Sequence, residues 1–337
     1  MRRRHFLGGA LAWPLVATSA KAAEPAVLRM ATVAPDGTPW AAGLVSFKAE
    51  AERLTGGRVS VRPFLGGVLG DENETVLQTQ RGQIQGVGAS TGALATVVPE
   101  LNVLELPYLF RTAAEADHIL DKVILADLEA AFRARGLVLG FWSENGYRSF
   151  GTRFGAIRGP ADLAGHKMRS QESQVHLAMY RAFGASPVPI PVTEVLTSMQ
   201  NGVIDGYDNT PLYAMAAQWT TVTKTYSLTN HIYQPAAIAF NKAWFDGLSA
   251  ADQTALLTVR SGLMLTMRKE IRALHPLLVQ NLTELDVAVY QPTPAELATF
   301  EAPAKAARDG YLAKASAGEK ALYAKIAAGL AALRKGP

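Results

Sequence analysis

Alternating and helical hydrophobic patterns follow one another in the first part of the chain. Apolar and polar residues alternate over 27–31, which predicts a β-strand. Residues 40–54 have apolar side chains at helical spacing, and a pair of glycines follows at the predicted helix end. Residues 59–61 alternate again and complete a strand–helix–strand unit. The turn at 35–38 follows the first strand, so we expect it at the sheet edge where ligands bind.

A third strand is predicted next, and it leads into a serine-containing glycine motif. The pattern predicts a helix over 71–81 and a strand over 84–87, followed by Gly-Ala-Ser-Thr-Gly at 88–92. This is a literal G-x-S-x-G, so a hydrolase that uses Ser90 as nucleophile is one alternative. Asp205 and His231 are candidates for its acid and base. The motif is short and the chain is rich in glycine, so this alternative rests on little.

The segment 165–211 has the most informative order of elements. It predicts a short strand, an amphipathic helix, a second short strand and a capped helix, and it ends in a turn of Gly, Asp and Asn. Arg169 and Asn209 both fall at element ends, where the crevice beside an open α/β sheet would receive them. The alternative for Arg169 is an ordinary surface cation next to Lys167.

The rest of the chain continues the same alternation. We expect a helix over 113–135, a strand over 137–141 and a returning strand near 238–240. A long helical pattern then runs from 249 to about 285, and Pro276 should kink or break it. Strands that alternate with helices in this way are typical of the α/β class, and the chain shows no internal repeat.

Length and composition favour a folded protein with more than one core. The chain has 337 residues, 49% of them hydrophobic and 18% charged. Such a chain is too long for one ordinary core, so we expect two lobes. No stretch has the low-complexity composition of a disordered region.

The N-terminus has the pattern of an export signal. Three arginines precede an apolar stretch from Phe6 to Ala17, and Ala20-Lys21-Ala22 supplies a cleavage site, so residues 1–22 are predicted to be a cleavable signal peptide. The tract from Arg3 to Leu7 also fits the twin-arginine pattern, although Sec export stays open. The alternative of a retained anchor is weak, because the apolar stretch is shorter than the roughly 20 residues that span a bilayer. The expected location is the periplasm.

Removal of residues 1–22 changes the net charge of the chain. Residues 1–22 hold four basic residues and no acid, so the mature chain has 33 − 4 = 29 basic residues against 29 acidic ones. This balance gives no support to nucleic-acid binding. The chain has no cysteine, which excludes disulfides and thiolate chemistry, and its six histidines show no metal-ligand spacing. We expect neither a metal nor a cofactor.

Several tracts together resemble one protein family. They are T-G-G-R-V-S-V (55–61), G-G-V-L-G-D-E (66–72), V-P-E-L-N-V-L-E-L-P-Y-L-F (98–110), N-G-Y-R (145–148), and the series K-M-R, F-G-A-S-P-V-P, E-V-L and M-Q-N-G-V-I-D-G-Y-D-N within 167–209. Their order is similar to that of the substrate-binding proteins of TRAP transporters, in the family of the dicarboxylate-binding subunit. The similarity covers nearly all of the mature chain.

The resemblance implies a two-lobed α/β fold of the periplasmic binding protein (Venus flytrap) type. The chain would cross between the lobes twice, and a long helix would brace both. Lobe I would comprise 23–146 plus 235–274, and lobe II 147–234 plus 275–337.

The resemblance also implies a ligand site in the cleft between the lobes. Arg169 matches the arginine that forms the main ion pair with a ligand carboxylate, Arg148 a second arginine, and Asn209 an amide beside them. An arginine suits this role because its two parallel N–H groups bind a carboxylate bidentately. The further candidate contacts from the family are Ser90, Thr91, Asp36 in the 35–38 turn, and Val192. For Arg148 the alternative is a hinge salt bridge to Glu144.

The function implied is that of a periplasmic receptor for a small organic acid, without enzymatic activity, that delivers its ligand to membrane permease subunits. It would act as a monomer or a homodimer. Besides the hydrolase, a binding protein of an ATP-driven uptake system stays an alternative. Val192 and Ala89 replace residues that sialic-acid binders have, so sialic acid is disfavoured. The sequence does not distinguish a dicarboxylate from a sugar acid, a 2-oxo acid or an aromatic acid.

Overall fold

The computed structural model describes residues 24–335, so the predicted signal segment lies outside the described part of the chain. Within it, nine strands form one mixed sheet in the order β2-β1-β3-β8-β4-β7-β5-β6, with β9 paired to β8. The strands are β1 (Ala26–Thr32), β2 (Val59–Phe64), β3 (Gly86–Ser90), β4 (Leu137–Thr152), β5 (Lys167–Ser170), β6 (Ser186–Pro189), β7 (Gly206–Asn209), β8 (Thr225–Asn241) and β9 (Ala288–Tyr290).

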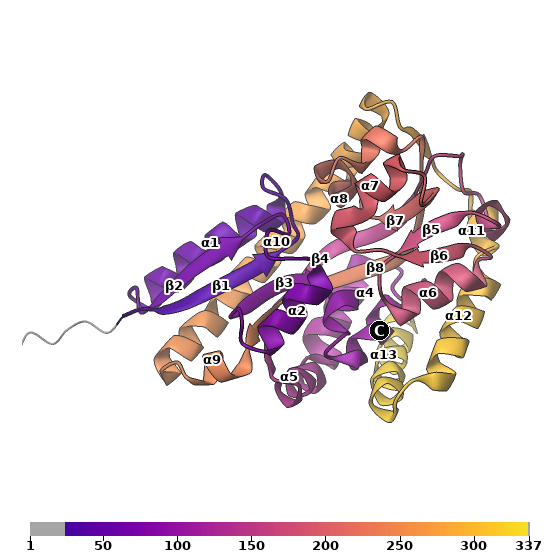
Figure 1. The fold of residues 1–337 in the computed structure, drawn as a ribbon. Helices are drawn as coiled ribbons and strands as arrows, with labels where there is room; N and C mark the ends of the chain where they lie inside the picture. The colour runs from indigo at the N-terminus through magenta and orange to yellow at the C-terminus, as the bar shows by residue number, and fades with distance from the viewer. Residues whose placement is uncertain (1–23, 336–337) are drawn as a thin grey trace, which may run out of the picture.

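Helices cover both faces of this sheet (Figure 1). The α-helices are α1 (Pro39–Leu54), α2 (Glu72–Gln80), α3 (Thr91–Leu94), α4 (Ala113–His118), α5 (Leu125–Ala134), α6 (Gln174–Ala182), α7 (Val195–Gln200), α8 (Pro211–Ala216), α9 (Lys242–Asp246), α10 (Ala250–Glu284), α11 (Pro294–Ala298), α12 (Glu301–Lys314) and α13 (Ala317–Lys335). The 3-10 helices are η1 (Pro99–Glu105), η3 (Pro160–Leu163), η4 (Val192–Glu194) and η5 (Trp219–Val222), and η2 (Ile119–Val123) is a π-helix.

Two long strands join two halves of the molecule. β4 and β8 pair antiparallel in the middle of the sheet, with β1, β2 and β3 on one side and β5, β6 and β7 on the other. One hydrophobic core packs α1 against the first half, and separate cores lie under α6 and α7 in the second. The two halves are visible as the indigo and pink parts of Figure 1. The structure therefore has the expected α/β architecture with two strand crossovers.

The first strand–helix–strand unit forms as the hydrophobic pattern predicts. The Thr38 hydroxyl accepts a hydrogen bond from the Ala41 N–H and caps α1, and Pro39 occupies the first helical position, where a missing N–H costs nothing. The apolar stripe of α1, which includes Leu44 and Phe47, is buried. Gly43 faces Met267 so closely that an added Cβ would lie 2.6 Å from its sulfur, so glycine permits α1 to approach α10.

The helix α10 contacts both halves of the molecule. It is capped by Ser249, has 35 residues and continues through Pro276. It packs on α1 and β4, and further along the helix on α8 and β9. These contacts confirm the prediction of a long helix that spans the two halves.

Three local expectations differ from the structure. β3 ends at Ser90 rather than at Val87, because its residues pair with β8 as far as Ser90, so the glycine motif that follows the predicted strand forms the end of β3 and the start of α3. The single helix expected over 113–135 is divided into α4 and α5 by a π-helical turn. The strand expected over 137–141 extends to Thr152, because β4 crosses into the second half of the molecule and pairs there with β7.

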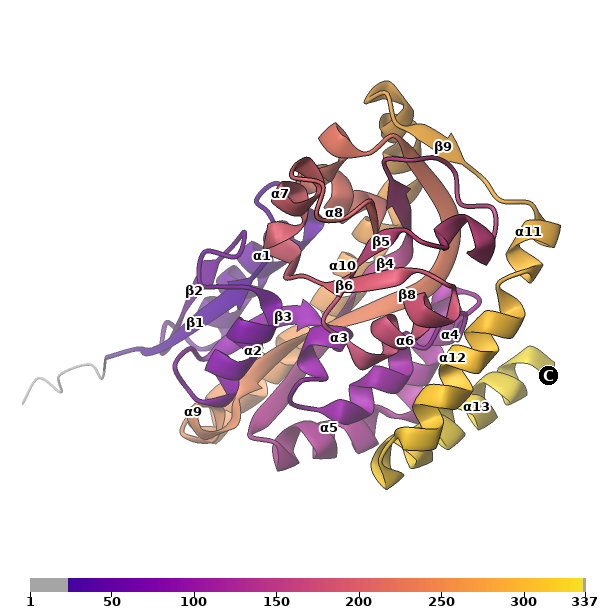
Figure 2. The same ribbon diagram turned by 45° about the vertical axis from the view of Figure 1, so that its right-hand side comes forward.

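The C-terminal helix lies on the first half of the molecule. α13 packs on η1 and η2, and Arg334 pairs with Glu115. α12 lies along α6, so the last two helices lie against different halves (Figure 2). The lobe boundaries given above stay a prediction, and these contacts favour a place for α13 in lobe I. No helix in the described residues is long and apolar enough to cross a membrane.

Candidate functional site

A small cavity lies between the two halves of the sheet. Its volume is about 40 Å3. The residues that line it come from both halves: Thr32, Val33, Ala34, Trp40, Glu72, Gly88, Ala89, Asn145, Arg148, Arg169, Gln171, Val192, Asn209, Tyr213 and Gln234. Four of the seven candidate residues from the sequence are among them, namely Arg148, Arg169, Val192 and Asn209.

Arg169 is the cation in this cavity that lacks an acidic partner. It lies on β5 and is 3% exposed, and its Nε donates to the Ile190 carbonyl at 2.9 Å. Among residues 24–335, no carboxylate forms a salt bridge with it. Burial, and then the nearby Arg148 guanidinium, lower its pKa. A buried guanidinium of this kind is costly unless an anion pairs with it.

Arg148, in contrast, is already compensated within the protein. Its Nε donates to Asp208 Oδ2 at 2.5 Å, and both side chains are buried. Burial alone would lower the pKa of Arg148, but the Asp208 carboxylate outweighs it and raises that pKa. Burial likewise acts to raise the pKa of Asp208, yet the Arg148 charge holds it well below its usual range. The acidic partner is Asp208 rather than Glu144, which pairs with Arg272.

Asn209 offers hydrogen-bond donors to the same cavity. It ends β7 and is buried, and its side-chain oxygen accepts from the Thr210 N–H at 2.8 Å and from Arg148 Nη1 at 3.4 Å. The amide oxygen is therefore used by the protein. Its NH2 group has no partner in the hydrogen bonds between described residues. A carboxylate near Arg169 could accept from it.

Glu72 is a cavity residue that sequence reasoning missed. It begins α2, and its two carboxylate oxygens accept from the Ser90 N–H at 2.8 Å and the Ser90 hydroxyl at 2.9 Å. Burial is the first cause that raises its pKa, to about 7, and the Asp71 carboxylate adds to the effect. In the sequence, Glu72 is the last residue of the tract G-G-V-L-G-D-E (66–72), and nothing in this tract indicates that Glu72 faces a cavity.

Ser90 and Thr91 do not line the cavity, although they were expected to contact the ligand. The Ser90 hydroxyl bonds to Glu72 and accepts from Gln171 Nε2 at 2.8 Å. The Thr91 hydroxyl donates to Glu105 at 2.6 Å. Both hydroxyls hold other polar side chains in place, so any effect on a ligand would pass through those side chains.

Asp36 also lies away from the cavity lining. Its side chain is exposed, and its Oδ1 accepts from the neighbouring Gly37 N–H. Val192, on the other hand, contributes an apolar side chain to the wall. Further polar lining comes from Thr32, Asn145 and Tyr213, and from Gln171 and Gln234, two buried amides whose place no motif indicated.

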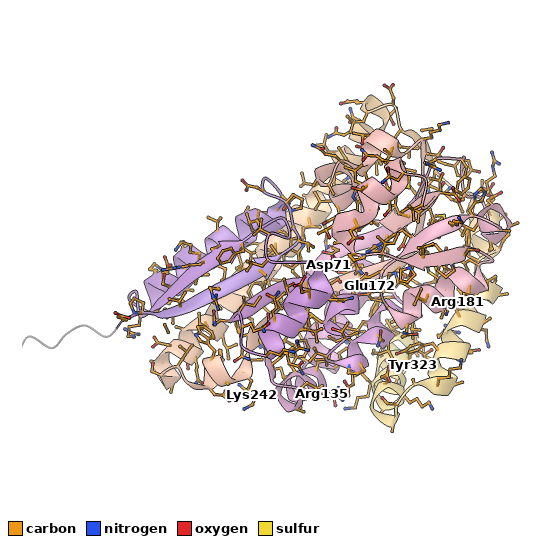
Figure 3. All side chains as sticks on the ribbon, in the orientation of Figure 1. Asp71, Arg135, Glu172, Arg181, Lys242 and Tyr323 are labelled. Atoms are coloured by element: carbon orange, nitrogen blue, oxygen red, sulfur yellow. The ribbon has the colours of Figure 1, made fainter. Side chains whose placement is uncertain are left out.

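Hydrogen bonds cross the cleft and hold the two halves together. Asp71 Oδ1 accepts from the Val192 N–H at 3.0 Å, and Glu172 accepts from Asn73 Nδ2 at 3.0 Å. Asp71 and Glu172 lie close to each other where the two halves meet (Figure 3). The structure therefore shows the cleft in a closed arrangement.

The surroundings of Ser90 do not fit a hydrolase. Among the hydrogen bonds recorded for residues 24–335, its hydroxyl bonds to Glu72, Gln171 and the Ala93 N–H, and none joins it to a histidine. His231 instead contacts Asp208 and Thr229. A serine nucleophile needs a base within hydrogen-bond reach. Within the described part of the chain, no cluster of acidic and histidine residues could hold a metal ion.

Comparison with known proteins gives the class to which this fold and cavity belong. Residues 30–314 match the family described as bacterial extracellular solute-binding protein, family 7. The chain belongs to this family, the substrate-binding proteins of TRAP transporters.

Curated relatives are similar over much of the chain. A solute-binding protein of Verminephrobacter eiseniae is 39% identical over 63% of this chain and 63% of its own. The 2,3-diketo-L-gulonate-binding periplasmic protein of Escherichia coli is 34% identical over 61% of this chain and 63% of its own. The matches thus span less than two thirds of these two relatives. The C4-dicarboxylate-binding periplasmic protein of Rhodobacter capsulatus is 31% identical over 76% of this chain and 78% of its own.

Solved structures of TRAP periplasmic solute-binding proteins share the fold. One from Roseobacter denitrificans with bound β-D-glucuronate has a TM-score of 0.85 and 25% identity, and covers 89% of this chain and 98% of its own. One from Polaromonas bound to D-erythronate has a TM-score of 0.84 and 28% identity, and covers 89% of this chain and 97% of its own. The two-lobed α/β fold expected from the sequence is thereby confirmed. These proteins bind solutes, as the family does.

Proposed function

We propose that this chain is the periplasmic receptor of a TRAP transporter, and that it binds one small hydroxylated monocarboxylate in the cleft between its lobes. Arg169 forms the main ion pair with the carboxylate, and Arg148 and Asn209 lie beside it. The closed lobes then deliver the ligand to the membrane permease subunits. The protein performs no chemistry on its ligand.

The single observation that carries this proposal is the uncompensated charge of Arg169. Arg148 is paired with Asp208, whereas Arg169 has only a carbonyl partner among residues 24–335. A carboxylate ligand supplies the missing anion, and each hydrogen bond to a charged group contributes roughly 1.5 to 3 kcal/mol net. Two arginines and an amide account for micromolar binding, about −8 kcal/mol, after the costs of ordering.

Glu72 supports a ligand with a single carboxylate. It lines the cavity together with the amides of Gln171 and Gln234, and these groups can bond to hydroxyls. A second ligand carboxylate near Glu72 would meet another acid, with Asp71 next to it. The ligands named for the solved relatives, β-D-glucuronate and D-erythronate, are monocarboxylates with several hydroxyls. The name of the Rhodobacter relative makes a C4-dicarboxylate the competing ligand class.

A thermal-shift screen tests this function directly. The mature protein is heated with D-glucuronate, D-galacturonate, D-erythronate, succinate, and neutral sugars and amino acids. A ligand at a hundred times its dissociation constant adds about 2.7 kcal/mol of stability, so binding should raise the melting temperature clearly. Shifts with the hydroxy acids support the proposal. A shift with succinate alone contradicts the monocarboxylate, and shifts with neutral compounds alone contradict the role of Arg169.

Arg169→Ala provides the residue-level test. Because the variant leaves the ligand carboxylate buried without its partner, we predict a loss of at least about 2 kcal/mol, or roughly thirtyfold in dissociation constant. Titration calorimetry with the acid that gives the largest thermal shift measures it. Arg181→Ala is the matched control, since Arg181 is exposed on α6 away from the cleft (Figure 3). Unchanged affinity in Arg169→Ala would remove Arg169 from the site.

A further inference from the structure

A fully buried histidine lies behind the ligand cavity, between two carboxylates. His176 is the third residue of α6, and its Nε2 is 2.6 Å from Glu105 Oε2. Its Nδ1 is 3.8 Å from Asp208 Oδ2 and has no hydrogen-bond partner among the described residues. His176, Glu105 and Asp208 are all 0% exposed. Each ring nitrogen thus faces a carboxylate.

This geometry favours the doubly protonated imidazolium. A neutral imidazole has one N–H donor and one lone pair, so one of its nitrogens would direct a lone pair toward an anion. Burial acts to raise the pKa of Glu105, but its hydrogen bonds with His176, Thr91 and Gln234 are among the contacts that outweigh it and lower that pKa. Glu105 is therefore ionised, and a proton on each nitrogen of His176 matches both acids.

Hydrogen bonds connect this pair to the cavity wall. Gln234 Nε2 donates to Glu105 Oε2 at 3.0 Å, and Gln234 Oε1 accepts from Arg148 Nη1 at 2.8 Å. Gly92 leaves room for this arrangement, since an added Cβ would lie 2.9 Å from Glu105 Oε2. The charge of the His176–Glu105 pair therefore acts, through these hydrogen bonds, on Gln234 and Arg148, which line the cavity.

The charges of this cluster cancel only if His176 is cationic. The ionisable groups that contact His176 are Glu105 from η1 and Asp208 from β7, and Asp208 in turn contacts Arg148 from β4, His231 from β8 and Tyr180 from α6 itself. Burial lowers the pKa of His231 and raises that of Tyr180, so both are neutral. Two cations then balance two anions. With a neutral His176 the cluster would have a net charge of −1.

We propose that His176 and Glu105 form a buried ion pair. This pair keeps the buried cluster of His176, Glu105, Asp208 and Arg148 neutral, so that Arg169 remains the cation available to a carboxylate. This inference rests on the proposed function and adds an electrostatic positioning role for two residues that do not line the cavity. A net negative charge on this cluster would compete with the ligand carboxylate for Arg169. Removal of the charge on His176 therefore weakens anion binding, whereas removal of the charge on Glu105 does not.

Three variants test the sign of this effect: His176→Gln, Glu105→Gln and the double variant. Titration calorimetry with D-glucuronate and D-galacturonate at pH 8 measures their affinities. We expect His176→Gln to weaken binding on the order of tenfold, the effect of one unit charge roughly 12 Å away at an effective dielectric constant of about 20. Glu105→Gln should bind at least as tightly as the wild type, and the double variant should recover most of the loss.

A merely structural role predicts a different pattern. Both single variants would then weaken binding alike, and the double variant would be no better than either. That result overturns the inference, as does wild-type affinity in His176→Gln.

Nitrogen NMR of histidine-labelled wild-type protein gives a readout that needs no ligand. The His176 signals are assigned from their absence in His176→Gln. Both ring nitrogens should carry protons at pH 7, and a neutral imidazole overturns the inference. If no carboxylate binds the wild type, the proposed function fails, while these spectra still decide the charge of His176.

Discussion

The carboxyl group of Glu72 combines a ligand-facing position with a raised pKa. Its pKa of about 7 exceeds the ordinary value of 4.5, so between these pH values the folded protein keeps a proton that the unfolded chain has released. The free energy of unfolding should therefore fall as the pH rises through this window, and Glu72 should contribute no further change above it. Glu72→Gln should reduce the loss between pH 5 and pH 8 by roughly 1 to 3 kcal/mol, a range that allows for water in the cleft.

Urea unfolding at pH 5 and pH 8 measures this difference. Glu74→Gln is the control, because Glu74 is exposed on the same helix. An equal pH dependence in the wild type and Glu72→Gln would mean that the Glu72 carboxyl is solvated and titrates as an ordinary acid.

At the residue scale, the family motifs indicated only part of the polar lining of the cavity. Arg169, Arg148 and Asn209 could be assigned because they stand in an ordered series of family motifs. Ser90 and Thr91 were expected to contact the ligand, but they lie at the end of β3 and the start of α3, where their hydroxyls bond to protein groups. Glu72 and the two glutamines come together only through the pairing of distant strands and helices, which local patterns do not contain.

At the scale of elements, the helix α10 retains a proline that helix energetics disfavours. Pro276 lies inside α10, lacks an N–H and is exposed. A proline in a helix interior costs about 3 kcal/mol, so Pro276→Ala should raise the free energy of unfolding by roughly 1 to 3 kcal/mol. Thermal and urea unfolding measure the gain, with Thr254→Ala, an exposed site in the same helix, as control. A loss of stability would show that α10 needs the proline geometry to contact α8 and β9.

Hydrophobic periodicity predicted most elements of the first half, and its failures have local causes. α1 and β2 lie where the apolar spacing placed them, because each buries one face against a single neighbouring layer. β4 and β8 are far longer than expected, since long segments of both strands are buried and so lack an alternating pattern. The π-helical turn between α4 and α5 leaves no mark in the apolar spacing.

At the scale of the whole molecule, bonds across the cleft should govern how long a ligand stays bound. Asp71 accepts from the Val192 N–H across the cleft, and this bond requires the two halves to be closed. Asp71→Ala removes the bond without removing a cation that the ligand needs. Because a hydrogen bond contributes roughly 0.5 to 1.5 kcal/mol net, we predict a dissociation rate about two to tenfold faster and an unchanged association rate.

Stopped-flow fluorescence can follow both rates, because Trp40 lines the cavity and should report on ligand entry. Asp36→Ala is the matched control from the same half of the molecule, since the exposed Asp36 side chain accepts a hydrogen bond from the neighbouring Gly37 N–H and does not line the cavity. An equal acceleration in both variants would restore Asp36 as a ligand or closure contact. A slower association in Asp71→Ala would instead mean that Asp71 acts before closure, on the open cleft that the ligand enters.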